Sequence, residues 1–166
     1  MGHIIYIIIP ILVFILFYAT RREVKAAEKN MDLDHFTVTQ SKIFLVVGII
    51  CAIVFFGFLV LAIFFSNDTA AWWVYLGLSL FFLFGLGLAI YCATWKLEIN
   101  NEQITYCPFI GIKKQYEIQN ITKIKIKSQQ WIKAYSGNKC TFKVDWNCRG
   151  YNILIERLQK EQIADE

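Results

Sequence analysis

The chain has 166 residues, of which 57% are hydrophobic, and its mean hydropathy is +0.45. A soluble domain of this size rarely reaches that value, so the composition favours a membrane part plus a water-facing part over one globular core. The formal net charge is +4. Because residues 1–95 carry as many acidic as basic side chains, the whole excess lies after residue 95, and it is too weak to indicate nucleic-acid binding.

The five cysteines do not favour a disulfide framework. Their number is odd, and no pair has the C-x-x-C spacing of a zinc site or a redox motif. Two lie inside apolar runs and three in the polar C-terminal part, namely Cys51, Cys92, Cys107, Cys140 and Cys148. We expect free thiols in a reducing cytoplasm.

An uncharged apolar run extends from Ile4 to Ala19 and predicts a first membrane-spanning helix over residues 1–20. Pro10 removes one backbone hydrogen bond and predicts a kink. A signal peptide is the alternative, but the run has no Lys or Arg before it and no small-x-small cleavage site before Arg21. We therefore expect an uncleaved span.

Two further runs without ionisable side chains predict spanning helices over residues 43–65 and 72–95, joined by a short loop at residues 66–71. Small residues on both helices either let the backbones approach closely or reflect the general frequency of glycine in membrane helices. Both interpretations stay open for Gly48, Cys51, Ala52, Gly57, Gly77, Ser79, Gly85 and Gly87.

Basic residues beside the runs determine the predicted topology. They are Arg21, Arg22, Lys25, Lys29, Lys42 and Lys96. The positive-inside rule places residues 21–42 and 96–166 in the cytoplasm, and the N-terminus and residues 66–71 outside. The spans lack the ionisable groups that mark ion or substrate paths, so they are typical of an anchor rather than a pump or channel. We expect a multi-pass protein of the cell membrane.

Residues 96–166 predict an α+β domain. Short segments of alternating polarity, separated by turn residues, predict strands over residues 96–99, 103–107, 112–118, 121–127, 131–135 and 139–145. Pro108 predicts that the second strand ends or bulges there, and Gly111 predicts a turn. Ser136-Gly137-Asn138 predicts a hairpin between the last two strands. The apolar spacing of Tyr151, Leu154, Ile155 and Leu158 then predicts one face of an amphipathic helix. Its polar side carries the pairs Glu156–Lys160 and Arg157–Glu161.

This part of the chain resembles the bacterial pleckstrin-homology-like domains. The similarity begins with Leu97-Glu98-Ile99 through Tyr106, Phe109-Ile110-Gly111, and the run from Ile118 to Ile124, where that family has a G-x-K-K turn and an I-x-x-I strand. It ends with Phe142-Lys143-Val144-Asp145, Gly150-Tyr151 and Leu154 to Leu158. The resemblance covers residues 94–163. It implies a split β-barrel capped by one α-helix, a binding or scaffolding role, and no catalytic residue.

Seventy-one residues, 96–166, is short for that fold, and small cores are marginal. Residues 34–40 show Phe36 and Val38 alternating with Thr37 and Thr39. This alternation gives the hypothesis that residues 34–40 add a strand or a covering segment to the sheet.

The candidate contact residues are basic side chains together with one tryptophan: Lys113, Lys114, Lys123, Lys125, Lys127 and Trp131. The lysines either face anionic lipid headgroups or form a solvated strand face, and we prefer the solvated face. In the same way, Trp131, Tyr135 and Trp146 either line a ligand groove or cover a small core, and we prefer the core.

No enzyme, cofactor or metal signature is visible. The sequence has no G-x-S-x-G, H-E-x-x-H, P-loop or G-x-G-x-x-G motif. The two histidines are His3 and His35, and His35 with Asp32 and Asp34 would make a poor metal cage. We therefore expect no catalytic, cofactor-binding or metal-binding residue.

The sequence predicts a membrane-anchored binding or scaffold protein whose pleckstrin-homology-like domain engages a protein partner or the inner leaflet. The alternative is a structural subunit of a larger membrane complex that packs through its transmembrane helices. Expected partners are the lipid bilayer, with anionic headgroups or another membrane protein as further candidates, and no nucleic acid.

Overall fold

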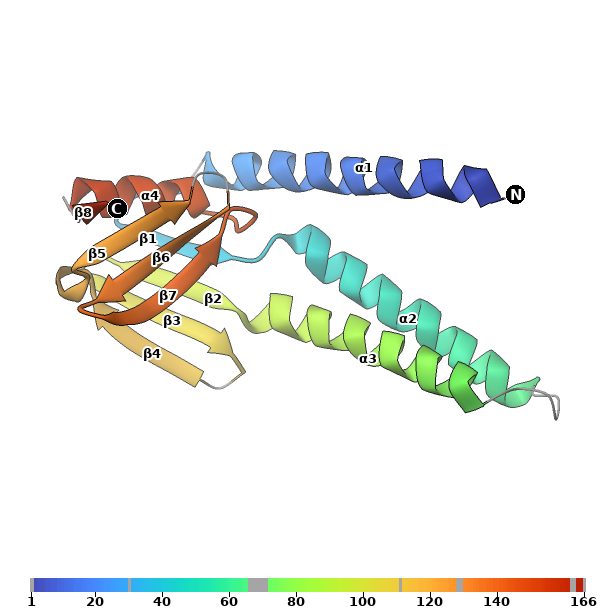
Figure 1. Cartoon of the computed structure of the whole chain (residues 1–166). Coiled ribbons are helices and arrows are strands. Elements are labelled where there is room, and N and C mark those ends of the chain that lie inside the picture. The colour runs from blue at the N-terminus through green and yellow to red at the C-terminus, as the bar shows by residue number, and fades with distance from the viewer. Residues whose placement is uncertain are drawn as a thin grey trace. The chain divides into compact units, whose positions relative to one another are not determined.

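The computed structural model describes residues 2–29, 31–65, 72–110, 112–127, 130–161 and 164–165 (Figure 1). The predicted loop at 66–71 and the predicted turn at Gly111 lie outside these ranges. The chain is α+β, as predicted, and divides into two units. One comprises residues 42–94, and the other comprises residues 1–41 and 95–166.

Two long apolar helices form the first unit, α2 (Lys42–Phe64) and α3 (Trp72–Thr94). Their bounds agree to one residue with the predicted spans, because each span is one uninterrupted apolar run. Both helices are long and apolar enough to cross a membrane. The most apolar part of each is only 11% and 17% buried, which distinguishes them from the core helices of a soluble protein.

Small residues bring α2 and α3 together. Gly48, Ala52, Gly85 and Ala89 are buried. A Cβ atom on Gly85 would lie 2.7 Å from the backbone nitrogen of Ala52, and one on Gly48 would lie 2.8 Å from that of Ala89. This is the small-xxx-small arrangement of packed membrane helices. By contrast, Gly57, Gly77 and Gly87 face open space, so close packing explains two of the five glycines in these helices.

Helix α1 (Gly2–Glu28) differs from the prediction in two ways. It continues through residues 21–28, since Arg, Glu, Lys and Ala are good helix formers, so the predicted linker at 21–42 is helical in its first part. In addition, the described residues contain two candidate spans, α2 and α3, rather than the predicted three. Unlike those helices, α1 is charged in its second half and packs there on the β-rich part of its own unit.

The contacts of α1 with the β-rich part combine charge and aromatic packing. The Glu23 carboxylate lies 3.6 Å from Arg149 and accepts a hydrogen bond from the Ser41 hydroxyl. The Phe17 ring lies 5.1 Å from that of Trp146. The Arg21 guanidinium lies 4.7 Å from the first ring and 5.4 Å from the second. These contacts hold the second half of α1 against the domain.

Glu28, near the end of α1, caps the last helix, α4 (Tyr151–Lys160). The N-cap residue of α4 is Gly150, which has no side chain to satisfy the first backbone amides. Glu28 does this instead, because its carboxylate accepts hydrogen bonds from the Asn152 backbone nitrogen at 2.9 Å and from Asn152 Nδ2 at 2.7 Å. A carboxylate is also favourable beside the positive end of the helix dipole.

Replacing Glu28 with alanine should therefore lower the free energy of unfolding by about 1 kcal/mol, the usual cost of a lost helix cap. Glu28→Gln should cost less, since it keeps an acceptor oxygen and loses only the charge. Hydrogen exchange at the Asn152 amide and thermal unfolding would measure both. Glu156→Ala, at an exposed position on the same helix, is the control, and an equal loss there would contradict the capping role.

Four antiparallel strands form the first sheet in the order β1-β2-β3-β4. They are β1 (His35–Thr39), β2 (Lys96–Asn100), β3 (Gln103–Phe109) and β4 (Ile112–Glu117). The hypothesis for residues 34–40 is confirmed, because β1 pairs with β2 from His35↔Asn100 to Thr39↔Lys96 and buries Phe36 and Val38. The register shifts near Pro108, where the sequence predicted a strand end or a bulge.

The second sheet has the order β7-β6-β5-β8. Its strands are β5 (Lys123–Lys127), β6 (Trp131–Ser136), β7 (Lys139–Asp145) and the short β8 (Ala164–Asp165), and a 3-10 turn (Ile118–Asn120) precedes β5. Strands β5, β6 and β7 are antiparallel, whereas β8 runs parallel to β5. The predicted hairpin at Ser136-Gly137-Asn138 is confirmed, with Gly137 in the left-handed conformation that this tight turn uses.

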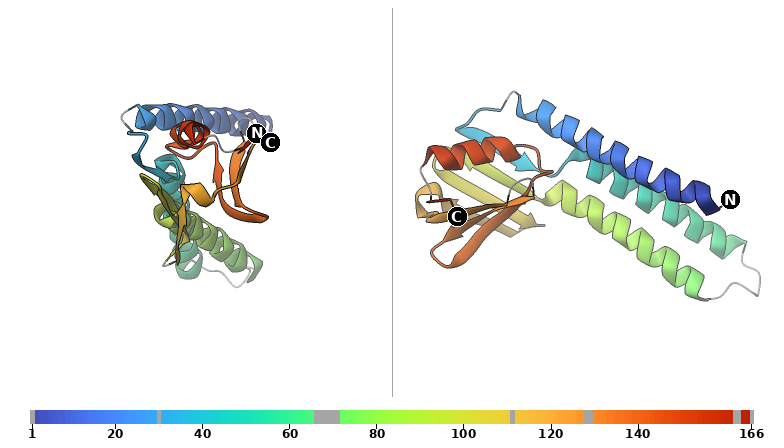
Figure 2. Two further views of the ribbon diagram at one scale, coloured as in Figure 1. Left: turned by 90° about the vertical axis from the view of Figure 1, so that its left-hand side faces the viewer. Right: turned by 45° about the horizontal axis from the view of Figure 1, so that its top comes forward.

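The core lies between the two sheets and α4, which lies across one side of both sheets (Figure 2). Its fully buried members come from both sheets and from α4, and include Leu97, Ile104, Ile124, Ile132, Phe142 and Leu154. Tyr151, Leu154 and Leu158 are buried as the helical spacing predicted. The prediction that Arg157 lies on the polar side of the helix is wrong, because this residue is only 6% exposed. The described strands form two sheets and no closed barrel.

Candidate functional site

The six candidate residues from the sequence lie on both sheets. Lys113 and Lys114 are exposed on β4. The other four share one face of the second sheet, since Lys127 lies opposite Trp131 and the three β5 lysines alternate along one strand. Trp131 and Tyr135 are half-buried on this outer face, while Trp146 packs against the core. The structure thus separates the candidates into two groups.

The lysine face of the second sheet is larger than predicted. Lys125 lies opposite Lys133 on β6, which in turn lies opposite Lys143 on β7. The Lys133 ammonium lies 4.6 Å from the Trp131 ring centroid, and the Lys143 ammonium lies 2.9 Å from Asp145. Like charges directly opposite one another weaken a sheet slightly. Sequence reasoning missed Lys133 and Lys143, although the register of the predicted hairpin would have shown them.

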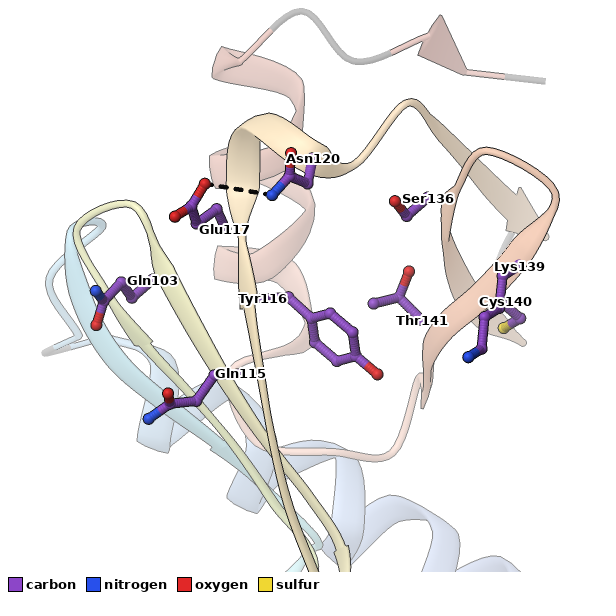
Figure 3. Close-up of a pocket in the computed structure, with 9 residues that line it drawn as sticks. All are labelled: Gln103, Gln115, Tyr116, Glu117, Asn120, Ser136, Lys139, Cys140 and Thr141. Carbon is purple, nitrogen blue, oxygen red and sulfur yellow. Dashed lines mark hydrogen bonds between the residues drawn. The ribbon is translucent and has the colours of Figure 1, made fainter.

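A cleft lies between β4 and β7, the outer strands of the two sheets in the described part of the chain. We call it the edge cleft (Figure 3). Its volume is about 420 Å³, within the range of sites that hold small ligands or short peptide segments. The side chains that line it are Gln103, Gln115, Tyr116, Glu117, Asn120, Ser136, Lys139, Cys140 and Thr141.

Thr141 is the unusual residue of the edge cleft. The β6–β7 register runs from Ala134↔Phe142 to Tyr135↔Cys140, so Thr141 is the extra residue of a β-bulge. Bulges of this kind redirect a side chain. Thr141 is only 8% exposed, and its buried hydroxyl has no hydrogen-bond partner among the described residues. Figure 3 shows the hydroxyl oxygens of Thr141 and Tyr116 in the space between the two strands.

A sequence model of one protein family matches residues 3–166. The chain belongs to DUF6560, a family of unknown function. The match covers both units, so the helical pair and the β-rich domain are parts of one family architecture. Comparison with curated proteins and with solved structures gives no match.

The edge cleft of this DUF6560 member is suited to binding by hydrogen bonds. Gln103, Gln115 and Asn120 supply amides, and Glu117 and Lys139 supply one charge of each sign. The Asn120 amide donates to the Glu117 carboxylate at 3.2 Å. Amides and hydroxyls both donate and accept hydrogen bonds, as peptide groups do.

Cys140 is the thiol that lines the edge cleft, and no histidine is among the lining residues. The described residues also contain no group of three or more His, Cys, Asp or Glu side chains that could hold a metal ion. All five cysteines are thiols, as predicted.

Sequence reasoning missed the edge cleft altogether. Gln115, Tyr116 and Thr141 belong to strands that the sequence predicted. However, a bulge leaves no mark in a pattern of alternating polarity, and the approach of β4 to β7 depends on the packing of two separate sheets. No sequence signal available from one chain would have found Thr141.

Proposed function

We propose that the protein is a membrane-anchored binding protein, whose β-rich domain holds an extended peptide segment of a protein partner in the edge cleft. The observation that carries this proposal is the Thr141 hydroxyl, which is buried without a partner and faces a polar cleft. An unsatisfied buried hydroxyl costs stability. A ligand that accepts or donates one hydrogen bond there removes that cost.

A peptide is the favoured ligand because both walls of the edge cleft are sheet edges. The outer sides of β4 and β7 pair with no other described strand, so they present backbone N–H and C=O groups. An extended peptide can add to such an edge by backbone hydrogen bonding. Lysine at a sheet edge disfavours non-specific strand pairing. Other parts of the two strands carry such residues, namely Lys113, Lys114 and Lys143. Among the residues that line the edge cleft itself, Lys139 is the one lysine.

The proposed anchoring of the protein in the membrane depends on its long apolar helices. In this proposal α2 and α3 cross the cell membrane, and residues 1–20 form a third span, with the N-terminus outside and the domain in the cytoplasm. The basic residues beside these segments support this orientation. Lys96, the second residue after α3, donates a hydrogen bond to Glu98 at 2.5 Å, and this contact raises the pKa of the Lys96 ammonium.

The proposal treats the domain as a pleckstrin-homology-like split barrel. Support comes from an antiparallel sheet of four strands followed by the β5–β6–β7 meander and a C-terminal helix, the arrangement that the sequence resemblance implies. Such a domain is a binding or scaffolding module, and we propose no catalytic activity for it.

The test is a Thr141→Val substitution, which removes the hydroxyl and keeps the shape. We expect the free energy of unfolding to rise by about 1 kcal/mol, because the variant no longer buries an unsatisfied group. In contrast, affinity for linear peptides selected from a displayed library on the full-length protein should fall about tenfold, the effect of one lost hydrogen bond. Denaturant unfolding and titration with the selected peptides measure the two quantities.

Thr105→Val is the matched control, since Thr105 is half-buried on β3 and does not line the edge cleft. It should leave peptide affinity unchanged. Peptides that bind the Thr141→Val variant as tightly as the original protein, or a library that yields no binder, would contradict the proposal.

One observation favours the alternative of a structural subunit. An apolar groove of about 440 Å³ on α3 is lined by Gly77, Leu80, Phe81 and Phe84, and Gly77 faces open space. A helix of another membrane protein would fit such a surface. A partner retained by the Thr141→Val variant and lost on Gly77→Leu would favour this second function over the first.

A further inference from the structure

The hairpin between β3 and β4 carries apolar side chains that face solvent. Phe109, Ile110 and Ile112 are 51%, 56% and 48% exposed. Apart from the three long helices and Phe65, which directly follows α2, they are the exposed large apolar side chains of the described residues. We call these three side chains the apolar tip. A cluster of this kind on a small domain commonly marks an interaction surface.

Strand register places the apolar tip at one particular end of the first sheet. Lys96 lies opposite both Thr39 on β1 and Cys107 on β3. At this end the chain leaves β1 for α2 and returns from α3 to β2. Phe109 lies two positions beyond Cys107, so the apolar tip extends past the ends of β1 and β2 at which the chain connects to α2 and α3.

The reach of the apolar tip matches the depth of a membrane interface. Two residues of extended strand cover about 7 Å. The headgroup region on each side of a bilayer is about 5–8 Å thick. A tip that extends this far past Lys96, the residue next to the proposed membrane exit at Trp95, is long enough to cross the headgroup region.

The residues that flank the apolar tip suit the same environment. Lys113 and Lys114 follow it directly and are exposed. Long lysine side chains place their apolar stems along a hydrophobic surface and their ammonium groups among anionic headgroups. Pro108 precedes the tip at a shift in register and has no N–H to leave unsatisfied near lipid.

We propose that the apolar tip inserts into the membrane interface beside the exit of α3 and fixes the orientation of the domain on the bilayer. This inference rests on the proposed membrane anchoring and is independent of peptide binding in the edge cleft. It assigns different surroundings to the two lysine groups. Lys113 and Lys114 contact lipid, whereas the lysine face of the second sheet stays with solvent or protein.

The experiment uses the full-length chain reconstituted in phosphatidylcholine vesicles, with a photoreactive benzophenone amino acid in place of Ile110. Alkaline extraction first verifies that the protein is integrated. After illumination, mass spectrometry measures the fraction of protein joined to lipid. The matched control carries the same group in place of Asn138, an exposed residue in the β6–β7 turn of the second sheet. This turn lies at the end of the β-rich domain away from the apolar tip (Figure 1).

We expect the lipid adduct at position 110 to exceed that at position 138 at least tenfold. Replacing Phe109 and Ile112 with aspartate should reduce the adduct at position 110 several-fold. Adding phosphatidylserine to the vesicles should increase the adduct without being required for it. The Thr141→Val substitution should leave it unchanged, which separates this result from the test of the edge cleft.

Equal lipid adducts at positions 110 and 138 in integrated protein would overturn the inference, while the anchoring would stand. An adduct at position 110 that joins two protein chains rather than protein and lipid would also overturn it. So would an adduct that forms only when phosphatidylserine is present, because the lysines alone would then account for the contact.

Discussion

Replacing Gly85 with leucine is expected to separate α2 from α3. A Cβ atom at this position would meet the Ala52 backbone nitrogen at 2.7 Å, the Gly48 carbonyl oxygen at 3.0 Å and the Cys51 Cβ at 3.1 Å. Two of these contacts are backbone atoms, so no side-chain rotation can relieve the clash. We expect a loss of about 3 kcal/mol or more, at the upper end of the cost of overpacking.

Thiol reactivity in detergent during heating would measure this loss, because Cys51 lies beside Gly85 at the helix interface. Its modification should begin at a markedly lower temperature in the Gly85→Leu variant. Gly87→Leu is the control, since nothing lies within 4 Å of a Cβ atom at Gly87. If both variants released the Cys51 thiol at the same temperature, close packing at Gly85 would not be what holds the helices together.

Arg157 is the second position at which we expect a large effect. Its guanidinium lies 2.5 Å from Glu161, 3.7 Å from Asp34 and 3.3 Å from the Asn101 carbonyl oxygen. It thus joins the end of α4 to the start of β1 and to the β2–β3 turn. Arg157→Ala removes these contacts and leaves a cavity, and we expect the free energy of unfolding to fall by roughly 2–4 kcal/mol.

Arg157→Met separates packing from charge. Methionine fills most of the volume, and the carboxylates of Asp34 and Glu161, which are partly exposed, can return to water. Replacing a buried ionic group with an apolar one of similar size is often tolerated, so this variant should be clearly more stable than Arg157→Ala. Amide exchange at Asn101, which donates to the Asp34 carbonyl oxygen, reports the local effect. Equal losses in the two variants would mean that packing by the side-chain stem contributes little.

Elements defined by a local pattern could be predicted from the sequence. Helices α2 and α3 follow from uninterrupted apolar runs, and β1 follows from the alternation of Phe36 and Val38 with threonines. The burial of Arg157 could not be predicted in this way, since its position on the helix looks polar and its partner Asp34 lies far away in sequence. The edge cleft could not be predicted from the sequence for the same reason. It depends on a bulge at Thr141 and on the approach of two sheets, and neither has a local signature.

The order of elements gives the helical pair an unexpected position, between two neighbouring strands of one sheet. Strand β1 ends at Thr39 and β2 begins at Lys96, so α2 and α3 occupy the place of an ordinary turn between paired strands. Joining such distant strands through a flexible chain would cost considerable loop-closure entropy. The packed helical pair removes that cost by bringing Lys42 and Thr94 to the same end of one hairpin.

Under the proposed membrane anchoring, assembly of the β-rich domain depends on insertion of the helical pair α2 and α3. Until α2 and α3 pack, pairing of β1 with β2 carries the full loop-closure entropy. Without this pairing the first sheet lacks Phe36 and Val38, two of its core side chains. Under the proposed anchoring, a chain whose helical pair did not enter the bilayer would leave this sheet incomplete and open to proteolysis. The proposal therefore couples completion of the β-rich domain to insertion of the chain that carries it.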